Sequence, residues 1–87
     1  MSNQEVINRF KNGQSGKSSN GNLWISYDGD RLFNYSTCIA QRLENGSFVV
    51  NSTKYSPTTS KIQNYVRCTL KTYKEVTNRP LGCGWLV

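Results

Sequence analysis

The chain has 87 residues with eleven lysine and arginine side chains, five carboxylates and no histidine, so its net charge is +6. A chain of this length folds as one small domain, and the positive charge favours an anionic partner, most simply a nucleic acid. Without histidine, a general base would have to be a carboxylate or a lysine with a shifted pKa. The composition therefore argues against an enzyme, and nothing in the sequence indicates a cofactor.

The first 21 residues predict a short helix followed by a flexible loop. Val6, Ile7 and Phe10 lie at helical spacing within Asn3–Lys11, a pattern typical of an amphipathic helix. Residues 13–21 contain three glycines and three serines, which predicts a polar loop.

Residues 22–53 predict antiparallel strands, and the first turn, Asp28-Gly29-Asp30, allows two registers. A two-residue loop pairs Ile25 with Leu32, whereas a three-residue loop with a bulge pairs Ile25 with Phe33. We favour the second register because it gathers the large side chains on one face.

The second turn is predicted at Asn45-Gly46, since this dipeptide tolerates the positive φ of a tight hairpin, and it pairs Leu43 with Phe48. The long run from Arg31 to Leu43 needs a bend or bulge near Ser36-Thr37. Counting by twos places the following residues on one buried face: Leu23, Ile25, Phe33, Tyr35, Ile39, Leu43, Phe48 and Val50. We expect an α+β fold, with a three- to four-stranded antiparallel meander packed against one main helix.

That helix is predicted over residues 56–74, with Ser56 as N-cap and Pro57 at the first helical position. Its apolar stripe should cover the buried face of the sheet and consists of Ile62, Tyr65, Val66, Thr69, Leu70 and Tyr73. Residues 75–87 are expected to form a tail or an edge strand, and the last three either return to the sheet edge or hang free.

The start of the helix is a candidate anion site, because free N–H groups, hydroxyls and lysines meet there. The candidate binding residues are Lys54, Tyr55, Ser56, Thr58, Thr59, Ser60 and Lys61.

A row of cations continues along the solvent side of the helix, with Glu75 the one carboxylate near it. Its members are Lys61, Arg67, Lys71 and Lys74, with Asn64 among them. Cations about 5–6 Å apart suit a phosphate backbone or an acidic protein face, and the alternative is a solvated surface. Trp24 should face away from the core, where it would stack on a base or anchor an interface, unless the first helix or the tail covers it.

Two weaker patterns are rejected as sites. Ser15-Gly16-Lys17-Ser18 looks like the end of a phosphate-binding P-loop, but Lys11 stands where that motif needs its first glycine, and a strand follows. Asp28 and Asp30 lie at a turn tip, which gives no enclosed metal coordination.

The three cysteines, Cys38, Cys68 and Cys83, lack Cys-x-x-Cys spacing, so we expect free thiols and no metal. The opening residues do not have the pattern of a signal peptide, and no run reaches the roughly 18 apolar residues of a membrane span. A cytoplasmic protein without membrane association is expected.

Several segments resemble a family of short phage-encoded proteins of unknown function, in which a strand rich in Val and Asn leads into Tyr-Ser-x-Thr-Thr-Ser. The likeness covers about residues 20–66 and rests on Asn22-Leu23, Arg31–Tyr35, Ile39–Arg42, Val49–Asn51 and above all Thr53–Asn64. Members often carry a histidine where this chain has Ile62. The resemblance implies a small accessory phage protein, often a modulator of host machinery or host defence, and it brings no catalytic assignment.

Three functions remain open. The first, which we favour, is a non-catalytic inhibitor of a host defence nucleoprotein in the infected bacterium, as anti-CRISPR proteins are. The second is a module that binds DNA or RNA directly through the basic helix row. The third is capture of a signalling nucleotide at Ser56–Lys61. The sequence does not predict the oligomeric state.

Overall fold

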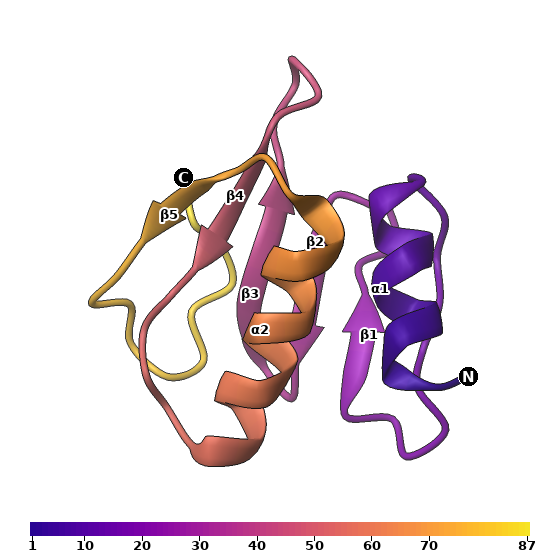
Figure 1. The fold of residues 1–87 in the computed structure, drawn as a ribbon, viewed down its shortest axis with the longest axis horizontal. Helices are drawn as coiled ribbons and strands as arrows, with labels where there is room; N and C mark the ends of the chain where they lie inside the picture. The colour runs from indigo at the N-terminus through magenta and orange to yellow at the C-terminus, as the bar shows by residue number, and fades with distance from the viewer.

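The computed structural model describes all residues 1–87, and two helices cover one face of a five-stranded sheet (Figure 1). In chain order the elements are α1 (Asn3–Lys11), β1 (Leu23–Ile25), β2 (Arg31–Asn34), β3 (Thr37–Arg42), β4 (Phe48–Asn51), α2 (Pro57–Leu70) and β5 (Lys74–Val76). The strands lie side by side in sequence order, with β1 to β4 antiparallel and β5 parallel to β4. The α+β class is confirmed. The sheet has one more strand than predicted. This strand, β5, is parallel to β4 because α2 connects the two and returns the chain to the end of the sheet where β4 begins.

Helix α1 forms as predicted. Ser2 and Glu5 make a capping box, in which the Ser2 hydroxyl accepts from the Glu5 N–H at 3.2 Å and the Glu5 carboxylate accepts from the Ser2 N–H. Val6, Ile7 and Phe10 are fully buried against the sheet.

The favoured register of the first hairpin is wrong. Ile25 pairs with Leu32 and Trp24 with Phe33, which is the register of the two-residue loop. Side-chain hydrogen bonds close this tight turn: the Ser26 hydroxyl accepts from the Arg31 N–H and donates to the Asp28 carboxylate. The free energy of these hydrogen bonds is therefore larger than the free energy that would be gained by gathering the large side chains on one face.

The predicted bend near Ser36-Thr37 is a complete hairpin turn. Asn34 pairs with Thr37, and Tyr35 adopts a φ of 56° between them, so the run expected as one bent strand is divided into β2 and β3. A bulge is present, but it lies within the β2–β3 pair, where the register shifts between Leu32 and Phe33.

The hairpin at Asn45-Gly46 exists with a register one residue away from the prediction. Arg42, and not Leu43, pairs with Phe48. The loop is longer than the predicted two-residue turn. The Leu43 N–H donates to the Ser47 carbonyl across it, and Gly46 within it takes a φ of 86°. Since a shift of one residue moves a side chain to the other face, the predicted single buried face is wrong.

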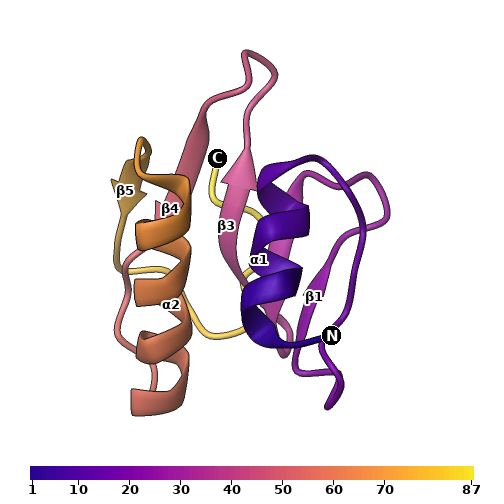
Figure 2. The ribbon, with the colours of Figure 1, turned by 45° about the vertical axis from the view of Figure 1, so that its right-hand side comes forward.

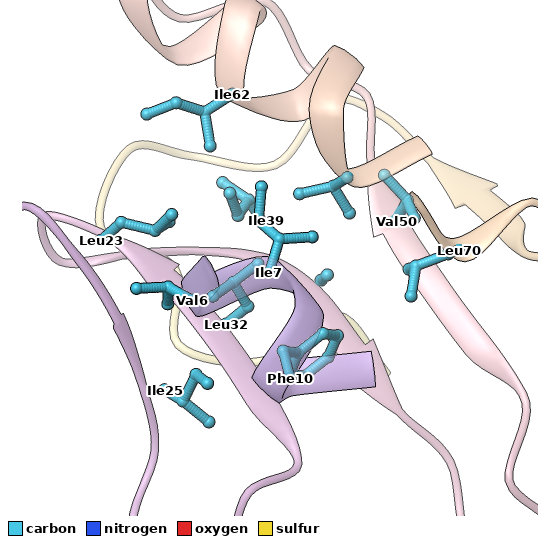
Figure 3. Close-up of a cluster of buried hydrophobic side chains, with 12 residues drawn as sticks. Val6, Ile7, Phe10, Leu23, Ile25, Leu32, Ile39, Val50, Ile62 and Leu70 are labelled. Carbon is cyan, nitrogen blue, oxygen red and sulfur yellow. The ribbon is translucent and has the colours of Figure 1, made fainter. Parts of the chain in front are cut away.

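The sheet instead has two apolar faces. The helix-side cluster joins both helices to the sheet and consists of Val6, Ile7, Phe10, Leu23, Ile25, Leu32, Ile39, Ala40, Val50, Ile62, Val66 and Leu70 (Figure 3). The tail-side cluster lies on the other face and consists of Phe33, Cys38, Val49 and Leu86, with Trp24, Leu43, Val76 and Cys83 packed against it.

The tail, residues 80–87, covers the second face (Figure 2). The Cys38 N–H donates to the Cys83 carbonyl at 2.8 Å, and the Leu86 N–H donates to the Gln41 side-chain oxygen at 2.8 Å. Leu86 is 1% exposed. The last three residues therefore neither hang free nor form an edge strand, and the fifth strand is made by Lys74–Val76 instead.

Helix α2 starts as predicted, with Ser56 accepting from the Thr59 N–H at 3.2 Å and Pro57 in the first turn. It ends at Leu70 rather than Lys74, because Lys71 takes a φ of 65°. Leu70 is buried as expected.

The buried side of α2 is rotated relative to the predicted stripe. Tyr65 was expected in the interface and is 39% exposed, whereas Gln63 is 2% exposed. The Gln63 amide donates to the carbonyls of Asn51 and Thr53, which ties α2 to the end of β4. No helix has the length and apolar character needed to cross a membrane.

Candidate functional site

Three arginines contact the tail or the first hairpin. The Arg31 guanidinium lies 3.7 Å from the centre of the Trp85 ring and donates to the Gly84 carbonyl. Arg42 pairs with Asp30 at 3.8 Å, and Arg79 donates to a tail carbonyl at 3.2 Å. All three side chains are half-buried, and their guanidinium groups are engaged mainly in contacts within the chain.

Five of the other eight cations lie on α2, on β5 or in the segments next to them. Residues 54–75 contain five lysines and arginines and one carboxylate. We define the basic face as Lys61, Arg67, Lys71 and Lys74. Only Lys61 and Arg67 lie on α2, because the helix ends at Leu70, so the predicted row along one helix is wrong for Lys71 and Lys74. The three lysines are exposed, and none of the four forms an ion pair with a carboxylate.

Arg67 is the most ordered member of the basic face. Its guanidinium donates to the Asn64 amide oxygen and to the Ser52 hydroxyl, the latter at 3.3 Å. The same Ser52 hydroxyl donates to the Glu75 carboxylate at 2.8 Å. The one carboxylate of this region is therefore held near Arg67, and the three lysines stay free for an external anion.

A groove of about 410 Å³ lies where the basic face ends, between the β3–β4 hairpin and the link from α2 to β5. Its apolar side chains are Phe48, Leu70 and Tyr73, and Lys74 is also part of its lining. Sequence reasoning missed this groove because its walls come from segments far apart in the chain. Tyr73 is the one groove residue that the sequence could have indicated. The helical spacing placed it in the buried stripe of the helix, whereas it is half-buried in the structure.

The hydroxyl-rich start of α2 borders a second, smaller hollow of about 180 Å³. Its lining brings together two segments of the family resemblance, and consists of Asn34, Tyr35, Ser36, Thr37, Tyr55, Thr59 and Leu81. The Thr59 hydroxyl donates to the Asn34 side-chain oxygen at 2.7 Å, and the Tyr55 hydroxyl donates to the Arg79 carbonyl at 2.9 Å. These hydroxyls hold the fold together.

The same contacts limit anion binding at the start of α2. Pro57 has no N–H, the Thr59 N–H goes to the Ser56 hydroxyl and the Ser60 N–H goes to the Ser56 carbonyl. Within the first turn this leaves the Thr58 N–H without an internal acceptor. Among the candidate side chains here, Lys54, Ser56, Thr58 and Lys61 are exposed, Tyr55 and Ser60 are half-buried, and Thr59 is buried.

Trp24 lies on the tail side of the sheet and is half-buried. Its ring stacks on Phe33 with 4.3 Å between centres, and its N–H donates to the Tyr35 carbonyl at 2.7 Å. The structure therefore separates Trp24 from the helix-side cluster, and much of its ring is occupied by internal contacts.

The carboxylates and thiols do not lie together in one cluster. No cluster of three or more cysteine, aspartate and glutamate side chains could hold a metal ion. Hydrogen bonds from Ser2 and Ser26 lower the pKa of Glu5 and Asp28 respectively, and both carboxylates close local turns. Burial raises the pKa of Cys38 to about 12. Cys68 is exposed and Cys83 half-buried.

No match was found among curated proteins or among solved structures. One family's sequence model matches residues 1–79. The matched range includes residues 20–66, over which the resemblance to phage proteins was seen, and also takes in α1 and residues 67–79; the match itself does not show a phage origin. On this match, the chain belongs to DUF8033, a family of unknown function.

Proposed function

We propose that the protein is a non-catalytic binding protein whose basic face contacts the phosphate backbone of a nucleic acid. The observation that carries this proposal is the excess of five cations over one carboxylate in residues 54–75, with Lys61, Lys71 and Lys74 exposed and unpaired. Such contacts give affinity through counterion release and do not depend on base sequence.

The groove beside the basic face favours a single strand over a duplex. Phe48 and Tyr73 are half-buried in its lining, and Lys74 lies beside them. An unpaired base can stack on such an aromatic side chain while its phosphate meets the lysine, and stacking contributes about 1–3 kcal/mol per base. The bases of a duplex are stacked on each other and cannot enter the groove.

The test is a titration of labelled single- and double-stranded oligonucleotides at two or more salt concentrations. Lys61→Gln with Lys74→Gln should lower the log–log salt slope by about 1.4–1.8, which corresponds to two lost phosphate contacts. The matched control is Lys11→Gln with Lys17→Gln, which removes the same charge from exposed sites outside the basic face. Absence of binding at low salt, or an equal effect of the control pair, would overturn the proposal.

Tyr73→Leu tests the preference for single strands separately. This change keeps an apolar side chain in the groove but removes the aromatic face. It should weaken single-strand binding about 5- to 100-fold and leave duplex binding unchanged. Tyr65→Leu is the control, because Tyr65 is exposed on α2 and is not part of the groove.

A second candidate is the inhibitor of a host defence nucleoprotein, and one observation favours it. Tyr35 and Leu81 are 59% and 78% exposed, and both lie beside the hollow at the start of α2. Exposed apolar side chains at a hollow are typical anchors of a protein interface. In this function the protein would come from a phage and would block cleavage by guide-RNA nucleases.

That candidate is tested with a panel of purified guide-RNA nuclease complexes and their target DNA. The protein should inhibit at least one complex at near-stoichiometric concentration, and Tyr35→Ala or Leu81→Ala should relieve the inhibition without changing oligonucleotide binding. If no complex is inhibited, or if the inhibition survives both changes, this interface is excluded.

A further inference from the structure

Two of the three thiols lie on adjoining segments of the tail-side face. Cys38 is in β3 and is fully buried, and Cys83 is in the tail and half-buried. The Cys38 N–H donates to the Cys83 carbonyl at 2.8 Å, so the two residues are direct neighbours across the contact between strand and tail.

Both side chains also belong to the same side of the sheet. Cys38 is a member of the tail-side cluster, and Cys83 packs against that cluster. A backbone hydrogen bond of this kind places neighbouring chains about 5 Å apart, which is within the Cα separation of about 4.4–6.8 Å that a disulfide spans. Cys68 lies apart from this pair, exposed on α2.

We propose that Cys38 and Cys83 form a reversible disulfide that fastens the tail to β3 when a small-molecule disulfide such as oxidised glutathione is present. The reduced form, with both thiols free, is the form described above. The disulfide is a modification site that goes beyond nucleic-acid or partner binding, and it does not depend on either proposed function.

The reaction proceeds by two thiol–disulfide exchanges. The Cys83 thiolate attacks one sulfur of oxidised glutathione, the S–S bond breaks, and one glutathione leaves as its thiolate. Cys38 then loses its proton and attacks the Cys83 sulfur, and the second glutathione leaves. The two protein thiols give up two electrons and two protons in total, and one oxidised glutathione becomes two reduced ones.

The environment of the thiols sets the order of these steps. Burial and, to a smaller extent, the nearby Cys83 thiol raise the pKa of Cys38 to about 12, so Cys38 holds almost no thiolate while the tail is closed. The half-buried Cys83 is therefore the first to react. Cys38 reacts second, when local opening of the tail admits water to its sulfur.

The disulfide would close a loop of about 45 residues, and such a constraint stabilises mainly by reducing the entropy of the unfolded chain. It would also prevent the tail from leaving Phe33 and Val49, its partners on the sheet. Oxidation is thus expected to make the tail-side face permanently covered, while the reduced protein can open it transiently.

The experiment uses the full chain carrying Cys68→Ser, which prevents disulfides through the exposed thiol. After equilibration with oxidised glutathione, the mass should fall by two hydrogens, proteolysis should yield a peptide pair joined at Cys38 and Cys83, and a reductant should reverse both. The melting temperature of the oxidised form should rise by about 5 °C or more.

The control is the same chain with Cys83→Ser added, which leaves the buried core residue in place and should show neither the mass change nor the melting shift. A product that carries glutathione on Cys83 and never loses it would overturn the proposal. So would a joined peptide pair without any change in melting temperature, since the tail would then not be fastened in its folded position.

Discussion

The two faces of the sheet are buried in different ways. Twelve buried residues form the helix-side cluster, and they come from elements whose apolar side chains repeat with a regular period. Four form the tail-side cluster: three come from the sheet, and the fourth, Leu86, comes from the segment without helix or strand that covers them. The helix side is thus held by many apolar contacts. The tail side depends on a few individual ones.

The tail contacts illustrate this dependence. The Gly82 N–H donates to the Thr37 hydroxyl at 2.8 Å, and the Leu86 N–H donates to the Gln41 side chain at the same distance. Leu86 is the single tail residue that is fully buried. Because each bond is made by one side chain, loss of one contact should loosen the whole segment, whereas α2 should survive the loss of one side chain.

The largest effect is expected on the helix side, at Leu70. It is 5% exposed and closes the end of the helix-side cluster. Leu70→Ala should lower the free energy of unfolding by about 3 kcal/mol, a large share of the stability of a small domain. Urea unfolding followed by circular dichroism measures this loss. A midpoint equal to that of the unchanged chain would mean that α2 does not pack on the sheet.

A smaller loss is expected on the tail side. Leu86→Ala should cost about 2 kcal/mol, because the tail can relax into part of the cavity. It should also free the tail, so amide hydrogen exchange at residues 82–86 should become faster than exchange in β4. If exchange of the tail is already complete within seconds in the unchanged chain, the tail is not bound and the comparison between the faces fails.

The helices could be predicted because their signals are local. Three apolar side chains at helical spacing define α1, and the Ser56-Pro57 pair defines the start of α2. The hairpin registers could not, since they depend on side-chain bonds of single residues such as Ser26. One wrong residue in register exchanges the faces of every following side chain, and this explains the prediction of a single buried face.

The candidate site was predictable to a similar degree. Charge spacing in residues 61–74 was enough to place Lys61 and Lys71 on the surface, where they lie. The groove was not predictable, because it depends on how the β3–β4 hairpin meets the link to β5. The tail has no period, so the sequence did not predict which residues of the second face it contacts.

Variants at two residues of α2, Gln63 and Tyr65, test which side of the helix faces the sheet. Gln63→Ala removes the donor to the carbonyls of Asn51 and Thr53 and should cost about 1–2 kcal/mol. Tyr65→Ala, on a residue predicted to be buried and found 39% exposed, should cost less than about 1 kcal/mol. Urea unfolding of both variants checks the rotation of the buried stripe, and the reverse order would contradict it.

The smallest effect is a pH dependence at the turn that decides which residues reach the tail side. Hydrogen bonds from the Ser26 hydroxyl and then from the Asp30 N–H lower the pKa of the Asp28 carboxyl. Because the folded pKa lies below the unfolded one, ionised Asp28 stabilises the fold above the unfolded pKa, and this stabilisation is lost as the pH falls through the folded pKa.

Asp28→Asn should therefore lose less stability than the unchanged chain between neutral and acidic pH. Glu44→Gln is the control, since it replaces an exposed carboxylate in the other hairpin loop. Identical profiles for the unchanged chain and Asp28→Asn would mean that this carboxylate does not hold the turn, and that the register of β1 and β2 is fixed by packing against Phe33 and the tail.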